Sequence, residues 1–396
     1  MAQREAVIVG AVRTPVGRRR GILRGWHPVD LLGVTLRELV DRTGVDETLI
    51  DDVIAGCVIQ NEEQTGNLAR HAVLAAGLPE SIPAVTVDRQ CGSGQQAVSF
   101  AAQAIIADSA DLVIACGVES MSRVPMPPSM TPGAPLGPQY SPRERARYSA
   151  GSASGELMAQ GASSELMNTR FGLTRADLDR FSARSHERAW AATQAGHFAD
   201  QLVTMHADPA DPASALITAD EGIRPNIDLD KMATLRTVFA DDGMTTAANS
   251  SQISDGAAAL LIADRDFAER HGLIPRARFR ALSVAAADPV IQFTAVLDAT
   301  EKACKKSGLN IDDIDLIEVN EAFAGVPLML AKHFGVPDDK LNVNGGSIAI
   351  GHPLGSTGAR MLTDLLCELE RTSKTFGLQT ICEASGTANT TIIERI

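Results

Sequence analysis

The sequence predicts an α/β protein whose fold is internally duplicated. Strand-like apolar runs alternate with amphipathic helical runs, which is typical of a mostly parallel sheet covered by helices. Residues 84–118 predict a strand, a turn, a helix and a second strand, and residues 341–382 repeat that order. A weaker pair of matching strands lies at 6–9 and 279–284. We therefore expect two halves of similar topology.

The first unit has a cysteine at its turn. Residues 85–87 predict a strand, and 95–106 predict a helix with small apolar residues on one face. Between them stands Cys-Gly-Ser-Gly at 91–94, which predicts a tight turn. The run Leu-Val-Ile-Ala-Cys at 112–116 predicts a buried strand.

The second unit has a histidine at the corresponding place. Residues 341–343 predict a strand that leads into a glycine-rich turn containing His352. A helix is expected over 356–370 and a strand over 378–382. The two turns are expected to meet at the carboxyl edge of the sheets.

A polar insert separates the halves. It opens with the proline-rich run VPMPPSMTPGAPLGP at 124–138 and lasts to about residue 248. We expect a lid or loop domain here. Within it, Thr174 with Asp177 resembles a capping box and Gly196 supplies a terminator, so residues 177–196 predict a helix.

Composition excludes several classes of protein. The net charge of −13 argues against nucleic acid as a partner, because a phosphate backbone attracts a surplus of Lys and Arg. Six scattered cysteines at 57, 91, 116, 304, 367 and 382 form no zinc-ligand or disulfide pattern, so we expect no metal site. No apolar run is long enough to be a signal or a membrane span, and a reducing cytoplasm is the expected location.

Cys91 is the first candidate for chemistry. A thiol at the start of a helix meets unpaired backbone N–H groups, which favour a thiolate, so we expect a lowered pKa. Gly92 and Gly94 are expected to leave room for a substrate carbonyl. Two other interpretations stay open: a small buried side chain, or a dinucleotide fingerprint G-x-G-x-x-A over 92–97. The fingerprint lacks the acidic residue expected after the next strand.

Three further side chains follow predicted strands or turns. His352 is a candidate base for the thiol, although a structural hydrogen-bonding role is the plain alternative. Cys382 ends a strand and is equally compatible with a core position, and Asn320 follows the strand at 315–319 but is also a candidate helix cap.

In this order and at these separations, the four segments resemble the thiolase family over nearly the whole chain. Further likeness lies in Arg-Thr-Pro-Val-Gly at 13–17, Gly-Val-Glu-Ser-Met-Ser at 117–122 and NSSQISDGAA at 249–258. The resemblance implies two βαβαβαββ halves in a five-layer αβαβα arrangement. It divides the chain into an N-terminal half at 1–119 and 249–268, a loop domain at 120–248 that binds coenzyme A and substrate, and a C-terminal half at 269–396.

The same resemblance implies a role for each site residue. Cys91 would carry the acyl group, His352 would activate it, and Cys382 would be the acid and base for the reacting carbon. Asn320, through a water, and His352 would form one oxyanion hole. The backbone N–H groups of Cys91 and Ala384 would form the other.

In the loop domain and the segment that returns from it, Arg224 would pack on the adenine of coenzyme A, Ser251 would contact its pantetheine arm, and Met158 would line the substrate site. Coenzyme A would be a co-substrate, with no further cofactor, and the protein would be a homodimer or homotetramer.

The implied activity is thiolytic cleavage of a 3-oxoacyl-CoA in lipid degradation, through an acyl-Cys91 intermediate. Alternatives are a biosynthetic acetoacetyl-CoA thiolase and a non-catalytic thiolase-like protein that binds coenzyme A. A decarboxylating condensing enzyme of the same fold is disfavoured by Cys382.

This chain departs from the family pattern near both cysteines. Asp88 stands where asparagine is usual, and a buried aspartate there would have to be paired or protonated. Ala384 and Ser385 replace glycines, which would strain the oxyanion turn if Ala384 needed a positive φ. The pair Leu157-Met158 replaces His-Met, and with Met126 and Met130 it suggests an adaptable apolar pocket rather than one for acetoacetyl-CoA.

Overall fold

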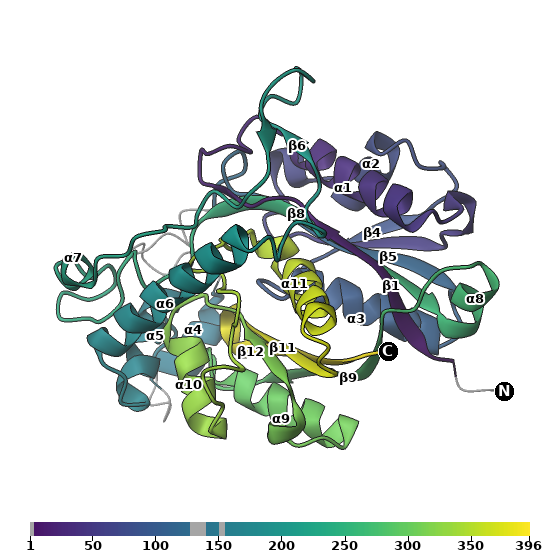
Figure 1. The fold of residues 1–396 in the computed structure, drawn as a ribbon. Coiled ribbons are helices and arrows are strands. Elements are labelled where there is room, and N and C mark those ends of the chain that lie inside the picture. The colour runs from purple at the N-terminus through teal and green to yellow at the C-terminus, as the bar shows by residue number, and fades with distance from the viewer. Residues whose placement is uncertain (1–3, 127–139, 150–154) are drawn as a thin grey trace.

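A ten-stranded sheet forms the frame of the molecule, with the strand order β10-β11-β12-β9-β1-β8-β5-β3-β4 and β2 paired to β8 (Figure 1). The computed structural model describes residues 4–126, 140–149 and 155–396. Its strands are β1 (Ala6–Arg13), β2 (Gly17–Arg18), β3 (Asp52–Gly56), β4 (Ala84–Val87), β5 (Leu112–Ser120), β8 (Ser254–Asp264), β9 (Ala277–Ala286), β10 (Leu316–Val319), β11 (Phe376–Glu383) and β12 (Thr387–Arg395).

The sheet consists of two half-sheets that meet at a short seam. β1 pairs with β9 only through Val7 with Arg278 and Ile8 with Ala277. Our expectation of a mostly parallel sheet is wrong: only β10 with β11, and β3 with β4 and β5, run parallel. The reason in the C-terminal half is the turn at 384–386, which is too short for a crossover and makes β11 and β12 an antiparallel pair.

Helices and half-sheets alternate in five layers. α3 (Ser93–Ile106) and α11 (Thr357–Arg371) lie between the half-sheets (Figure 1). α1 (Pro28–Thr43) and α2 (Leu68–Ala75) pack on the outer face of the first half-sheet. α9 (Ala295–Ser307) and α10 (Gly325–Phe334) pack on the outer face of the second.

The apolar pattern of β1 shows why this stacking forms. Val7 and Val9 join the core under α1 and α2, and Ala6 and Ile8 join the core around α3 and α11. After an irregularity between Ile8 and Gly10 the alternation is reversed, so Val12 faces the outer core. A strand buried on both faces needs a helical layer on each side. The expected layered α/β arrangement is therefore present.

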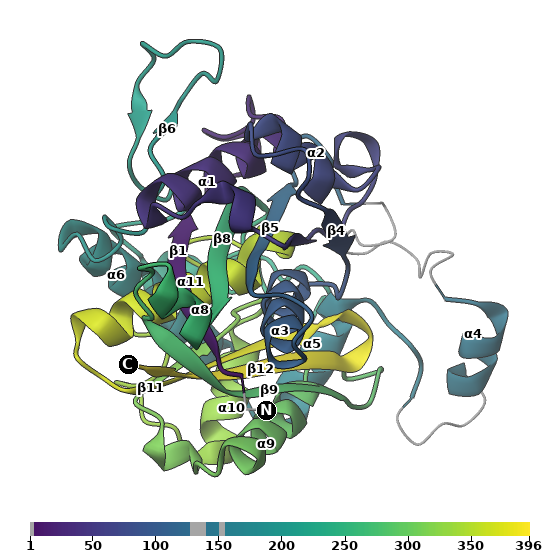
Figure 2. The same cartoon turned by 90° about the vertical axis from the view of Figure 1, so that its right-hand side faces the viewer.

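The insert and the short connections complete the chain. Figure 2 shows the segment of β6 projecting from the body beyond α1. The remaining elements are α4 (Pro142–Ser149), α5 (Gln160–Arg170), α6 (Arg175–Gln194), β6 (Met205–His206), β7 (Leu216–Ile217), α7 (Leu229–Ala233), α8 (Arg265–Arg270) and the 3-10 turns at 47–49, 62–64, 311–313, 354–356 and 384–386.

Two detailed predictions had different outcomes. The capping box is confirmed: the Thr174 side chain accepts from the Asp177 N–H, and the Asp177 carboxylate accepts from the Thr174 N–H. The strand expected at 341–343 is wrong, because Leu341 makes a single bridge to Ile317. The Asn342 side chain instead bonds the N–H and C=O of Val319, and such a bond competes with a backbone ladder. Among the helices that the structure describes, none is long and apolar enough to cross a membrane.

Candidate active site

The turn of Cys91 and the turn of His352 meet at the centre of the molecule. Cys91 lies just before α3, and His352 lies just before the 3-10 turn that leads into α11. A Cβ atom on Gly94 would stand 2.6 Å from the carbonyl oxygen of Gly355, which is closer than real Cβ atoms come to a backbone oxygen. Glycine at 94 therefore lets the two turns touch.

This contact corrects our interpretation of the glycines after Cys91. We expected them to leave room for a substrate, but the space is filled. The Glu383 carboxyl lies against Gly92, where a Cβ atom would be 1.9 Å from Oε1, and Gly355 lies against Gly94. The dinucleotide interpretation of the same residues loses its support for the same reason, since a pyrophosphate would need that space.

Cys91 is almost completely buried and lies in an apolar cluster with Leu354, Met361 and Ile381. Burial, and then the neighbouring Glu383 carboxyl, raise the pKa of the Cys91 thiol to about 12. Our expectation of a lowered pKa is wrong, because desolvation of a thiolate outweighs the backbone N–H groups at the start of α3. The resting residue is a neutral thiol.

His352 is held in a single tautomer. Its Nδ1 lies 2.7 Å from Oγ1 of Thr357, and that hydroxyl donates its only proton to the carbonyl oxygen of Pro353 at 2.8 Å. Nδ1 must then be the donor to Thr357, which leaves a lone pair on Nε2. Burial, and then the charge of Arg360, lower the pKa of His352 to about 3, so the imidazole is neutral.

Asn320 ends up beside that lone pair. It follows β10, and its Nδ2 lies 3.4 Å from Nε2 of His352. Ser347 donates from Oγ to Oδ1 of Asn320 at 2.6 Å, which fixes the amide with its NH₂ toward the imidazole. Asn320 is not the cap of α10, whose N-cap residue is Ala324.

Cys382 is a fully buried thiol near the end of β11. Burial, and next the Cys91 thiol, raise its pKa well above the ordinary value. The two sulfurs therefore lie close enough to interact electrostatically. Cys382 also packs in the core with Ala322 and Phe323. A position in the core and a role as a catalytic thiol are therefore compatible for this residue.

In the turn after Cys382, the strained backbone conformation lies one residue later than we expected. Ser385 has φ 64° and Gly386 has φ 78°, whereas Ala384 keeps a negative φ. A left-handed non-glycine residue costs about 1–2 kcal/mol. The Ser385 N–H donates to Oε1 of Gln292 at 3.1 Å, which helps to hold the turn.

Asp88 also differs from our expectation. It is exposed in this chain rather than buried, and its Oδ1 accepts from the Gln90 N–H at 2.7 Å. That bond closes the turn before the nucleophile, where Gln90 has φ 47°.

Of the expected coenzyme A contacts, Ser251 and its neighbour Gln252 are hydrogen-bonded to the segments that contain Asn320 and His352. The Ser251 N–H donates to the carbonyl oxygen of Ala322, and the carbonyl oxygen of Gln252 accepts from the His352 N–H. Gln252 Nε2 donates to the carbonyl oxygen of Gly222, two residues before Arg224. Arg224 itself is exposed.

Met158 is linked to the turn after Cys382 through Gln292, whose Oε1 accepts from the Ser385 N–H. It is half-buried against Tyr140 and Leu157, and its carbonyl oxygen accepts from Nε2 of Gln292. Met126 instead packs on the cluster around Cys91, and Met130 lies outside the described residues.

Sequence reasoning missed the residues that position this site. Glu119 is buried and accepts from the N–H groups of Val58, Ile59 and Gly355, which ties the two halves together. The sequence did contain a sign of this role, because Glu119 is a charged residue in a largely apolar strand. Thr357, Ser347 and Gln292 had no comparable signal, because their partners are distant in sequence.

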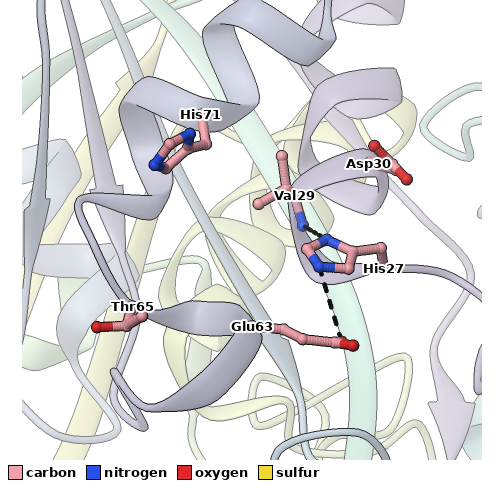
Figure 3. Close-up of a pocket in the computed structure, with 6 residues that line it drawn as sticks. All are labelled: His27, Val29, Asp30, Glu63, Thr65 and His71. Atoms are coloured by element: carbon pink, nitrogen blue, oxygen red, sulfur yellow. Dashed lines mark hydrogen bonds and ion pairs between the residues drawn. The ribbon is translucent and has the colours of Figure 1, made fainter.

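A cavity of about 500 Å³ lies away from this site, lined by His27, Val29, Asp30, Glu63, Thr65 and His71 (Figure 3). Figure 3 shows His27 between the Val29 N–H and the Glu63 carboxylate, with which its two ring nitrogens interact. The described residues include no cluster of three or more His, Cys, Asp or Glu side chains suited to a metal ion.

The fold and the paired turns define the class of protein. Residues 6–266 match the family of the thiolase N-terminal domain, and residues 273–395 match that of the thiolase C-terminal domain. The chain belongs to the thiolase family and is an acyltransferase, as the sequence predicted.

Comparison with individual proteins shows which members of the family the chain resembles. The chain is 48% identical over 392 residues to FadA6, a steroid 3-ketoacyl-CoA thiolase of Mycobacterium tuberculosis, covering 99% of this chain and 94% of the relative. It is 38% identical over 393 residues to a 3-ketoacyl-CoA thiolase of Bacillus subtilis, covering 97% of each. The solved structure of an acetyl-CoA acetyltransferase of Bacillus anthracis superposes with a TM-score of 0.88 at 34% identity and covers 100% of both chains. The predicted thiolase class is confirmed, and the names of the first two relatives give 3-ketoacyl-CoA esters as their substrates.

Proposed function

We propose that this thiolase cleaves 3-oxoacyl-CoA esters through an acyl group on Cys91, with His352, Cys382 and Asn320 in the roles given above. The observation that carries the proposal is the lone pair on Nε2 of His352, fixed by Thr357 beside Asn320. A neutral imidazole in that tautomer is a base that needs no prior deprotonation.

In the first step the Cys91 proton passes to Nε2 of His352 as the sulfur attacks the C3 carbonyl of the substrate. Both groups are neutral before attack, because burial raises the pKa of the Cys91 thiol and lowers that of the His352 imidazole. The C2–C3 bond then breaks, and Cys382 donates its proton to C2. Acetyl-CoA leaves, while the shortened acyl group stays on Cys91.

In the second step the thiol of coenzyme A gives its proton to the Cys382 thiolate and attacks the acyl-Cys91 thioester. The Cys91 sulfur leaves and recovers its proton from His352. Cys382 suits the acid role because its raised pKa keeps it protonated until a strongly basic carbon forms.

Oxyanions form on two different thioester or ketone oxygens during these steps. Nδ2 of Asn320, through a water, and protonated Nε2 of His352 would serve one, and the backbone N–H groups of Cys91 and Ala384 the other. Removing one such donor in well-studied enzymes costs about 10²–10³ in kcat.

Coenzyme A would enter along the segment from Arg224 to Ser251. Support comes from two bonds of Gln252: its Nε2 donates to the carbonyl oxygen of Gly222, and its carbonyl oxygen accepts from the main-chain N–H of His352. The exposed guanidinium of Arg224 is free to stack on an adenine there. Met158 would lie on the acyl side, at the edge of the pocket.

For the acyl chain we propose a bulky or ring-bearing group in a degradative direction. FadA6, at 48% identity, is named for steroid substrates. The wall around Cys91 contains Met121, Met126 and Met361, and methionine adapts to irregular apolar shapes. A biosynthetic acetoacetyl-CoA thiolase would instead prefer the smallest acyl groups.

We further propose a homodimer or homotetramer in a reducing compartment such as the cytoplasm. β4 is the last strand of the sheet, and Val85 on it is 42% exposed, which suits pairing with a second copy. All six cysteines are free thiols. Light scattering after size exclusion measures the assembly.

Intact mass spectrometry tests the catalytic proposal. After mixing with acetyl-CoA, the wild-type protein should gain one acetyl group, and Cys91→Ser should gain none. Cleavage of linear and ring-bearing 3-oxoacyl-CoA esters then ranks the substrates by kcat/KM. A protein that binds coenzyme A but never becomes acylated would be the non-catalytic alternative.

Cys382→Ala separates the two halves of the reaction. It should still accept an acetyl group from acetyl-CoA on Cys91, although more slowly than wild type, because the departing coenzyme A thiolate needs far less help from an acid than a carbanion does. It should lose carbon–carbon cleavage by about 10²–10⁴, the usual contribution of a positioned acid. Cys304→Ala, a half-buried thiol on α9, is the matched control and should retain both activities.

A further inference from the structure

Glu383 is a buried carboxyl group directly behind the nucleophile. It ends β11, follows Cys382 and has no solvent exposure. Its Oε1 lies so close to Gly92 that a Cβ atom there would be 1.9 Å away. The mechanism above gives this acid no role.

Only one oxygen of this carboxyl group is hydrogen-bonded. Thr387 on β12 donates from Oγ1 to Oε2 at 2.5 Å, while Oε1 has no partner among the described residues. A buried carboxylate normally collects donors on both oxygens, because an unpaired charged oxygen costs more than an unpaired neutral one. The arrangement favours the protonated acid, and burial raises the pKa of Glu383 to about 8.

The groups around Glu383 are few and identifiable. The segment before α3 contributes the positive charge of Arg89 and the negative charge of Asp88. The start of α3 contributes Cys91, and β11 contributes Cys382; a negative Glu383 raises the pKa of both thiols. The charge on Glu383 therefore acts on the two sulfurs that exchange protons.

The backbone of Gly92 is held from the same side by a second residue. Asn389 on β12 donates from Nδ2 to the carbonyl oxygen of Gly92 at 3.4 Å. The hairpin of β11 and β12 therefore fixes the residue that follows Cys91, and with it the start of α3.

We propose that Glu383 is a positioning residue of the acyl-transfer site, which packs against Gly92 as a neutral acid and keeps negative charge away from Cys91. When Glu383 ionises, its charge opposes the thiolate that forms on Cys91 and slows acylation. This inference rests on the proposed function, because it concerns the reactivity of the same sulfur.

Alkylation of Cys91 by iodoacetamide tests the idea without requiring turnover. The rate is followed by mass spectrometry from pH 6 to 9.5 in wild type and in Glu383→Gln, which reproduces the neutral acid in size and polarity. The rates should agree within about twofold at pH 6. Above pH 8 the variant should be roughly tenfold faster, since one pKa unit of charge interaction changes the thiolate fraction tenfold.

Two controls make the result specific. Asp52→Asn makes the same change at a carboxyl group whose pKa is also raised by burial, at the opposite end of β3 from the site; its alkylation should follow wild type at every pH. Thr387→Val removes the donor to Oε2 and should move the wild-type inflection to higher pH. It also provides a test if Glu383→Gln fails to fold.

Stability gives an independent readout with a defined sign. The folded state holds the Glu383 proton more tightly than the unfolded chain, whose pKa is about 4.5. The stabilisation from this group is complete below pH 4.5 and is lost as the pH rises through 8. The urea midpoint of Glu383→Gln should therefore rise relative to the midpoint of wild type as the pH increases from 5 to 9.

A constant ratio of alkylation rates across the pH range would overturn the proposal and leave Glu383 a filler of space. The proposed function is judged separately, by whether the wild-type protein becomes acetylated on Cys91. Acetylation with a constant ratio rejects only the role of Glu383, whereas absence of acetylation rejects the catalytic assignment.

Discussion

His352 Nδ1 and Thr357 Oγ1 lie 2.7 Å apart, and this contact decides which nitrogen of the imidazole is free to act as a base. Thr357 has only one hydroxyl proton, and Pro353 accepts it. The tautomer of the proposed general base is thus set by Thr357, the first residue of α11.

Thr357→Val should therefore impair catalysis with little change in coenzyme A binding. Valine keeps the shape but cannot accept from Nδ1, so the imidazole can rotate or change tautomer. We expect kcat to fall about 100-fold, the usual effect of a reacting group displaced by about 1 Å. Thr363→Val is the matched control: it is buried in the same helix, bonds only Ala359 and should stay near wild type. Equal losses in both variants would mean a general effect of α11 packing.

Asn320→Asp should lower kcat far more than it raises KM. The change keeps the side-chain shape but replaces the NH₂ near His352 Nε2 with a carboxylate oxygen, which repels a developing oxyanion. The expected loss is about 10²–10³ in kcat. Asn310→Asp, at the exposed cap of the 3-10 turn before β10, is the control for the same chemical change. A KM effect alone would place Asn320 in substrate binding rather than in the oxyanion hole.

The pH profile of kcat/KM should show no inflection near 6.5, the ordinary pKa of a histidine. Because burial and Arg360 hold the pKa of His352 at about 3, kcat/KM should not decline as the pH falls through 6.5 on account of this residue. The folded state keeps the imidazole neutral, so its stabilising contribution is complete above pH 6.5 and is lost as the pH falls toward 3.

Urea midpoints of wild type and His352→Asn measure that contribution. Asparagine does not titrate, so the variant should lose less stability than wild type between pH 6.5 and pH 4. His333→Gln, at an exposed histidine, should behave as wild type. Parallel curves for His352→Asn and wild type would show that His352 titrates normally in the folded protein.

The sequence predicted the elements that local patterns determine. The helices at 95–106 and 356–370 and the strands at 112–116 and 378–382 all form, with α3 beginning two residues earlier. The capping box at Thr174 is local as well. Pairing across the sheet is not local, which explains why the antiparallel strands were missed.

The sequence indicated which residues form the site but not the pKa values of their side chains. Strand ends and glycine turns pointed to Cys91, His352, Cys382 and Asn320 because such positions converge at a sheet edge. The pKa of Cys91 could not be predicted, because it depends on burial and on Glu383, which is 292 positions away in sequence but packs on the neighbouring glycine. The helix start was a correct local argument that a larger desolvation effect overrode.

Arg13 shows that contacts between distant segments, which the sequence does not reveal, also determine stability. As part of the opening motif, it was noted only as a family resemblance, but its guanidinium is fully buried between two carboxylates from distant segments. It bonds Asp220 in the insert and Asp364 on α11, and so joins both to β1.

Arg13→Met should destabilise the protein strongly. Removing one partner of a buried ion pair leaves uncompensated charge, here on Asp220, since Asp364 keeps its ion pair with Arg360, and typically costs about 3–5 kcal/mol. Arg18→Met is the control, since Arg18 pairs with Glu221 at 68% exposure and an exposed pair contributes about 0–1 kcal/mol. Urea midpoints at one fixed protein concentration measure both, so that any oligomer affects them equally. If Arg13→Met were no worse than Arg18→Met, the buried network would contribute no more than an exposed ion pair. A true buried ion pair predicts that Asp220→Asn partly restores the stability of Arg13→Met, because it removes the charge that has lost its partner.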